Sequence, residues 1–206
     1  MIIYAIIFIL SISMIFIYFN LKNFDSINTV FMLLIGFIIL GLRFISVGGS
    51  TLFYNPTTIM ISGLCATIIT VFAAIFIQLI KKFRKGFNYN FRYLVFLLAL
   101  YIFFGFLQQL FFNFVFLETV YNLTGNFSIS ILLGALFYFT FHTRSKSVEF
   151  LVGTFIMGTL WGTCYLLFGN LFWLGISHGI IGTMYYLNLW HDDMLRKRIK
   201  FIAKYL

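Results

Sequence analysis

Polar side chains that can exchange protons or orient a polar ligand are rare in this chain, and several of them interrupt long apolar runs. The stretch FFGFLQQLFFNFVFLETV carries Gln108, Gln109 and Asn113, and two later apolar stretches carry His142 and His178. Imidazole exchanges protons most readily near neutral pH, and amides orient polar groups by hydrogen bonding. Because burying polar groups in lipid is costly, these residues are the first candidates for a functional site.

The spacing along the chain predicts that two of these residues are neighbours. Residues equally far from the turn of a helical hairpin lie at similar depth, since each residue advances a helix by about 1.5 Å. With the turn centred in the NLTGN stretch, Gln108 lies about as far before it as His142 lies after it. We therefore expect Gln108 beside His142. We expect His178 to reach this depth through a tilted or partly unwound helix.

Glu118 is the one acidic side chain well within an apolar run, and on chemical grounds it is an obvious general base. Its position argues against that role. It lies within one turn of the predicted outer end of its span, ten residues and about 15 Å along the helix from Gln108. We therefore expect Glu118 to have a structural role near the outer interface.

The elements that carry these residues are predicted to be transmembrane helices. Of 206 residues, 62% are hydrophobic, 22% aromatic and only 9% charged, which excludes a soluble globular domain. We predict an all-α polytopic integral membrane bundle, a single transmembrane domain over residues 1–206. Seven apolar runs are long enough to span a bilayer: 2–20, 27–46, 57–80, 93–121, 127–143, 148–168 and 170–190.

The net charge of +9 is interpreted as a topology signal, and no nucleic-acid-binding motif accompanies it. Thirteen of the fourteen Lys and Arg residues fall in alternate connections and the C-terminal tail, and only Arg43 falls on the other side. The positive-inside rule predicts the N-terminus outside and the C-terminus inside. Residues 191–206 mix five basic residues with Leu, Ile and Phe, which predicts an amphipathic tail on an anionic cytoplasmic leaflet.

Over residues 95–190 the polar constellation resembles the CPBP family, which includes the CAAX prenyl endopeptidases and the Abi-type bacterial intramembrane proteases. The first motif of that family is a pair of glutamates followed by a phenylalanine and an arginine. This chain has Gln108, Gln109, Phe112 and Asn113 at the matching positions. A carboxylate pair and an arginine have thus become neutral amides together, which indicates a remodelled polar site.

The two histidines match the other motifs of the family. His142 follows an aromatic residue, Tyr138, by four positions, and His178 stands in an HxxxN-like helix with Gly182 where asparagine is expected. The resemblance implies an intramembrane peptidase in which the first glutamate, helped by the histidines, activates water, and the asparagine stabilises the oxyanion. It also implies a membrane peptide or protein as substrate and the bacterial plasma (inner) membrane as location.

The departures from the family pattern leave three hypotheses open. In the first, the protein is a peptidase in which His142 is the base, His178 assists, and Gln108 and Gln109 orient the substrate. In the second, a noncatalytic protein binds a lipid, peptide or partner helix in the same cavity. The third is a small transporter subunit. Glutamine takes no proton and is a poor metal ligand, so a zinc site of two histidines and one glutamine is not expected, and the sequence identifies no cofactor.

Overall fold

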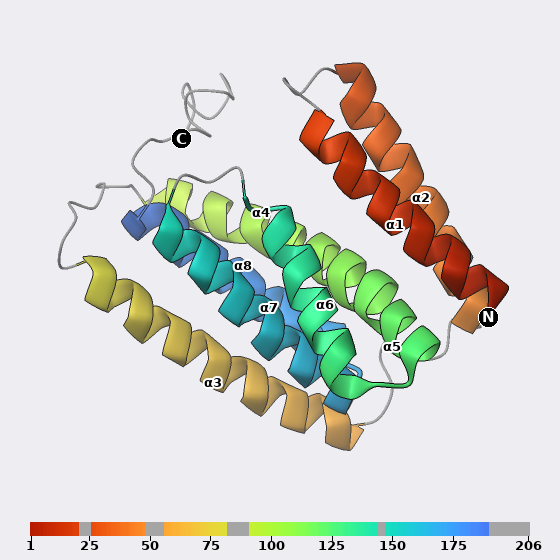
Figure 1. The fold of residues 1–206 in the computed structure, drawn as a ribbon. Coiled ribbons are helices and arrows are strands. Elements are labelled where there is room, and N and C mark those ends of the chain that lie inside the picture. Colours follow the sequence, from red (N-terminus) through yellow and green to blue (C-terminus); the bar gives the residue numbers. More distant parts are fainter. Residues whose placement is uncertain (21–25, 48–55, 82–90, 144–146, 190–206) are drawn as a thin grey trace.

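The computed structural model describes residues 1–20, 26–47, 56–81, 91–143 and 147–189, and these are almost entirely helical, with no strand (Figure 1). The predicted all-α class is therefore confirmed. The elements are α1 (Ile2–Asn20), α2 (Ser26–Val47), α3 (Pro56–Lys81), α4 (Phe91–Gln109), the π-helix η1 (Leu110–Leu117), α5 (Glu118–Thr124), α6 (Phe127–Thr140), α7 (Val148–Phe168) and α8 (Leu171–Leu189).

Helices α4, η1 and α5 are continuous, so the described residues form seven separate helices. The ends of each helix lie within three residues of the ends of a predicted apolar run. Three helical segments are long and apolar enough to cross a membrane, namely Thr58–Ile80, Phe91–Thr124 and Val148–Phe168. Shorter apolar helical segments cover Ile2–Ile15, Leu34–Ser46 and Phe127–Thr140. The tail 191–206 and most basic residues used to predict the orientation lie outside the described residues.

The turn between α5 and α6 falls in the predicted NLTGN stretch. Gly125 ends α5 in the left-handed conformation with φ of 63°, which glycine adopts without steric cost. The Asn126 side chain then accepts a hydrogen bond of 3.0 Å from the backbone N–H of Ile129 and caps α6. This turn makes the long fourth helix and α6 antiparallel, which is the hairpin geometry assumed in the depth argument.

Glycines bring α4 and α8 into backbone contact. A Cβ on Gly105 would lie 2.6 Å from the carbonyl oxygen of Gly175, and one on Gly179 would lie 2.6 Å from the backbone nitrogen of Ile102. Neither position can accept a side chain without movement of the opposite helix. Helix α8 is therefore held against α4 along the face that carries His178.

Helices α3 and α7 are fastened to α8 by one buried hydroxyl group. Ser177 Oγ accepts a hydrogen bond from Trp161 Nε1 of α7 at 3.2 Å and is hydrogen bonded to Thr70 Oγ1 of α3 at 2.8 Å. Within α7, Gly158 faces Tyr138 of α6, where an added Cβ would lie 3.1 Å from the ring. Gly158 belongs to a GxxxG pattern of the kind that mediates helix association, and here it serves packing inside the chain.

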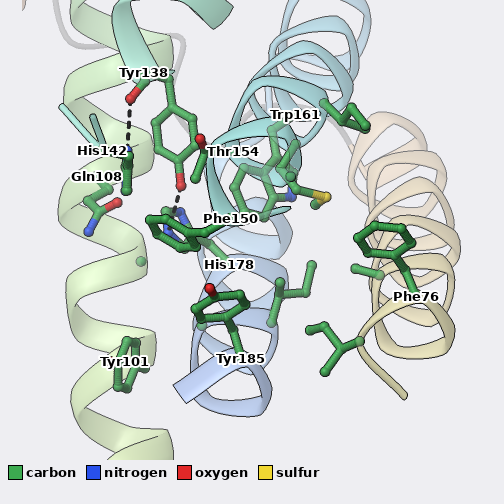
Figure 2. A pocket seen from close by; sticks show the side chains of 18 of the residues that line it. Phe76, Tyr101, Gln108, Tyr138, His142, Phe150, Thr154, Trp161, His178 and Tyr185 are labelled. Carbon is green, nitrogen blue, oxygen red and sulfur yellow. Dashed lines mark hydrogen bonds between the residues drawn. The ribbon is translucent and has the colours of Figure 1, made fainter. Parts of the chain in front are cut away.

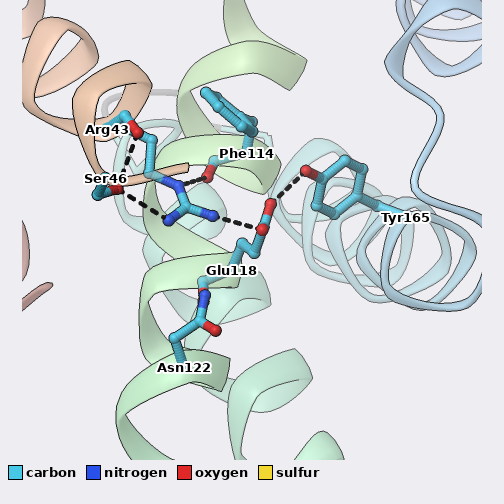
Figure 3. A network of polar contacts seen from close by, with 6 residues as sticks. All are labelled: Arg43, Ser46, Phe114, Glu118, Asn122 and Tyr165. Carbon is cyan, nitrogen blue, oxygen red and sulfur yellow. Dashed lines mark hydrogen bonds and ion pairs between the residues drawn. The ribbon is translucent and has the colours of Figure 1, made fainter. Parts of the chain in front are cut away.

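A buried ion pair joins the hairpin of α1 and α2 to the rest of the protein (Figure 3). Arg43 is fully buried, pairs with Glu118, and donates from Nε to the carbonyl oxygen of Phe114 at 3.0 Å. Tyr165 of α7 donates from its hydroxyl to the other oxygen of Glu118 at 2.5 Å. Glu118 thus links α2, the long fourth helix and α7, which is the structural role expected of it.

The π-helix explains why a carbonyl group is available to Arg43. The backbone N–H of Glu118 bonds to the carbonyl of Asn113, five residues earlier. Where such i to i+5 pairing returns to the α-helical i to i+4 pattern, one carbonyl is left without a backbone partner. The carbonyl of Phe114 lies at this switch and accepts the Arg43 hydrogen bond instead.

Candidate functional site

A cavity of about 220 Å³ lies between α3, α4, α6, α7 and α8 (Figure 2). Most of its wall is aromatic or aliphatic. Three of the four predicted site residues, Gln108, His142 and His178, line it, and the fourth, Gln109, contacts His178. Gln108 and His142 thus share one cavity, as the depth argument expected, and α8 brings His178 to the same place.

Both ring nitrogens of His178 are hydrogen bonded within the protein. Gln109 Nε2 lies 3.0 Å from Nδ1, and the Tyr138 hydroxyl lies 3.3 Å from Nε2. An amide nitrogen can only donate, so Nδ1 accepts, and Nε2 carries the ring hydrogen that is donated to the Tyr138 oxygen. The Trp161 ring stacks on the imidazole at a centroid distance of 4.4 Å. His178 is therefore held in one orientation and one tautomer.

The hydrogen bonds around His178 form a chain with one direction. Asn113 donates from its side-chain nitrogen to the Gln109 oxygen, Gln109 donates to His178, and His178 donates to Tyr138. Because the Tyr138 oxygen accepts from His178, its own hydroxyl hydrogen remains to be donated, and Tyr138 lines the cavity. Successive hydrogen bonds polarise one another, so this chain strengthens Tyr138 as a donor.

The sequence did not point to the Tyr138 hydroxyl as a functional group. One feature could have identified it: the aromatic position of the second family motif is a tyrosine here. Its hydroxyl adds a hydrogen-bond donor to an otherwise apolar side chain. In the sequence, Asn113 is one of the polar residues that interrupt the apolar runs, and it stands where the family has arginine. Its contact with Gln109 gives it a place in the network that the sequence pattern alone did not predict.

His142 lines the cavity, and one of its ring nitrogens has no hydrogen-bond partner among the described residues. Its Nδ1 lies 2.8 Å from the backbone oxygen of Tyr138, and a carbonyl oxygen can only accept, so Nδ1 carries the ring hydrogen. Nε2 therefore holds the lone pair, and no hydrogen-bond partner for it occurs in the described part of the chain. The backbone N–H of His142 bonds to Phe139, so the imidazole takes the Tyr138 carbonyl that the end of α6 leaves open.

Gln108 also lines the cavity, and its buried side-chain oxygen is an acceptor without a partner among the described residues. Figure 2 shows Gln108 and His142 on the same side of the cavity. Gln108 and Gln109 are adjacent in sequence, yet only Gln109 is engaged by the histidine network.

The position where the family pattern expects asparagine is closed by an aromatic ring. A Cβ on Gly182 would lie 2.7 Å from Cδ1 of Tyr101, so the Tyr101 ring occupies the space that a side chain at 182 would need. Tyr101 also lines the cavity. The absence of a side chain at Gly182 leaves room for the Tyr101 ring. The cavity is therefore lined by an aromatic ring at the place where the family pattern has an asparagine amide.

The residues of the site do not fit a divalent metal ion. A tetrahedral or octahedral site in a protein needs about three protein ligands with free lone pairs. Both nitrogens of His178 are already bonded within the protein, and no group of three His, Cys, Asp or Glu side chains gathers among the described residues. Within the described ranges, His142 is the one histidine at the cavity with a nitrogen lone pair not already bonded.

No curated protein and no solved structure matches the chain. Residues 90–184 match the family model described as type II CAAX prenyl endopeptidase Rce1-like. The match extends from the start of α4 into α8 and contains all four predicted site residues, whereas α1, α2 and α3 lie before it. The predicted resemblance is thereby confirmed: over residues 90–184 the chain carries an Rce1-like domain of the CPBP family.

Proposed function

We propose that the protein is an intramembrane peptidase-family enzyme that binds a peptide segment in the cavity and cleaves it with His142 as the general base. The observation that carries the proposal is that His142 lines the cavity with Nδ1 bonded to the Tyr138 carbonyl, so that Nε2 holds a lone pair with no partner among the described residues. A base must reach the proton that it removes, and its lone pair must be free. His142 meets both requirements, whereas His178 has no free nitrogen.

In the proposed reaction, His142 Nε2 takes a proton from water while the water oxygen attacks the peptide carbonyl carbon. The Tyr138 hydroxyl donates to the carbonyl oxygen as negative charge develops on it. The tetrahedral intermediate then collapses, the carbon–nitrogen bond breaks, and His142 returns the proton to the leaving amine. His178, Gln109 and Asn113 act through Tyr138 by fixing the position of its hydroxyl group and orienting its hydrogen.

The proposal includes seven membrane-spanning helices with the N-terminus outside and the C-terminus inside, in a bacterial plasma membrane. It is supported by the asymmetry of the basic residues and by the expected contact of the tail 191–206 with an anionic leaflet. In this orientation most of the lining residues come from the cytoplasmic halves of α3, α7, α8 and the continuous helix that α4, η1 and α5 form. The cavity would therefore receive its substrate from the cytoplasmic side.

Cleavage of membrane peptides by the purified full-length protein tests the proposal. We expect His142→Ala to lower the cleavage rate at least about 100-fold, because general base catalysis contributes about 10²- to 10⁴-fold. Tyr138→Phe should lower kcat at least about tenfold with a smaller change in KM. His191→Ala and Tyr121→Phe serve as matched controls. Equal cleavage by the wild-type protein and His142→Ala would refute the role of His142.

A noncatalytic binding protein is the second candidate, and one observation favours it. The family pattern calls for a carboxylate beside the histidines, and this chain has Gln108 and Gln109 there, with Gln109 held by His178. Such a protein would bind a peptide or partner helix in the same cavity without cleaving it. Binding that is unchanged by His142→Ala, in a protein that cleaves no peptide, would favour this candidate over the peptidase.

A further inference from the structure

The side-chain oxygen of Gln108 requires a donor that the described residues do not supply. The atom is buried, and a buried carbonyl oxygen without a hydrogen bond is unfavourable, which makes such groups rare in folded proteins. Three neighbouring donors do not reach it: the ring hydrogen of His142 goes to the Tyr138 carbonyl, Gln109 donates to His178, and the Tyr138 hydroxyl makes no bond to Gln108. A molecule bound in the cavity can supply the donor that Gln108 lacks.

The other residues that line the cavity restrict the chemical class of a ligand that could bind there. Gln108 Oε1 and His142 Nε2 are both acceptors, and Tyr138, Thr154 and Glu149 add further polar groups to the lining. Most of the remaining surface is formed by apolar side chains such as Phe104, Phe150 and Met157. A pure hydrocarbon chain would fill the apolar part and leave the Gln108 oxygen without a partner. A peptide segment with apolar side chains offers both components, because every residue except proline carries a backbone N–H.

We propose that Gln108 determines specificity by accepting a hydrogen bond from a backbone N–H of an apolar peptide segment, so that the cavity prefers amides to the corresponding esters. The inference rests on the proposed function and deepens it, since it assigns the substrate contact to Gln108 and leaves proton transfer to His142. The neighbouring glutamine has a different task, because Gln109 is bound to His178 and does not line the cavity.

Amide-to-ester substitution in a short peptide tests the proposal. The probe is an N-acetylated, C-terminally amidated tetrapeptide of leucine and phenylalanine. Three analogues each carry an ester oxygen in place of one internal N–H. Binding to the full-length protein in lipid nanodiscs is followed by tryptophan fluorescence, since Trp161 lines the cavity. We expect at least one ester to bind about tenfold more weakly than the amide, the ratio that one hydrogen bond typically gives.

The assignment to Gln108 depends on a comparison of variants. In Gln108→Leu the amide and the ester should bind equally, whereas Gln78→Leu, which changes an exposed glutamine of α3, should keep the tenfold ratio. Because an ester carbonyl is also a weaker acceptor, only the part of the ratio that Gln108→Leu removes counts as support. Equal binding of amide and esters to the wild type, a ratio unchanged in Gln108→Leu, or no binding of any probe would overturn the proposal.

The same experiment separates the inference from the proposed catalysis. If the wild-type protein cleaves no peptide but binds the amide more tightly through Gln108, the catalytic proposal fails and the inference stands. If cleavage depends on His142 but the amide-to-ester ratio does not depend on Gln108, the catalytic proposal stands and the inference fails.

Discussion

Replacing Arg43 by methionine tests how the α1–α2 hairpin is held against the Rce1-like domain. Arg43 is fully buried, and the side chain of Glu118 is 21% exposed, so loss of the arginine strands a largely buried carboxylate. Breaking one partner of a buried ion pair costs about 3–5 kcal/mol, and the partial exposure of Glu118 favours the lower end. Loss of the hydrogen bond to Phe114 adds about 1 kcal/mol. We therefore expect Arg43→Met to lower the free energy of unfolding by roughly 3–4 kcal/mol.

Equilibrium unfolding in mixed micelles with a denaturing detergent, followed by tryptophan fluorescence, measures this change. Arg92→Met, at an exposed arginine of α4, is the matched control and should lie within about 0.5 kcal/mol of wild type. The double variant Arg43→Met/Glu118→Gln removes both charges and should be less destabilised than the sum of the single variants, by about 1 kcal/mol or more. A loss below about 1 kcal/mol for Arg43→Met, or strict additivity, would refute the reasoning.

Three further predictions concern packing around the cavity, and unfolding measurements check all of them. Gly182→Ala should cost about 1–3 kcal/mol because its Cβ meets the Tyr101 ring, and Tyr101→Ala should relieve part of that cost; equal effects with and without the ring would contradict this. Gly179→Ala should cost more than Gly153→Ala, because a Cβ at 179 meets the α4 backbone whereas 153 is open. Ser177→Ala should cost about 1–3 kcal/mol since it leaves the buried Trp161 indole N–H without its acceptor, and a neutral result would contradict this.

Axial positions could be predicted well from the sequence, because every helical residue adds a fixed rise. The limits of the apolar runs and the common depth of Gln108 and His142 follow from counting residues. Rotation about the helix axis could not be predicted in the same way. The π-helix between Gln109 and Glu118 widens one segment and changes which side chains face each neighbour, and no residue in LFFNFVFL marks it.

Pairings between distant segments were equally hard to predict. From the sequence, Arg43 is only the one basic residue on the other side of the membrane, and Glu118 is only an acidic residue expected to have a structural role. Their opposite charges and similar depth made a contact possible, but many rotations of α2 satisfy the same depth. The network of His178, Tyr138 and Gln109 depends on side-chain directions in the same way, so the sequence identified two of its members as candidates without their connection.

The hydrogen bond between His142 and the Tyr138 carbonyl ties the proposed base to the end of α6. When Nε2 gains a proton, Nδ1 keeps its hydrogen and its partner, so the ring can alternate between neutral and charged forms without rotating. Each turnover would then begin and end with the imidazole in the same place. The arrangement also means that removing the imidazole frays a helix end, so Asn, which keeps a side-chain donor, is an informative companion to Ala at position 142.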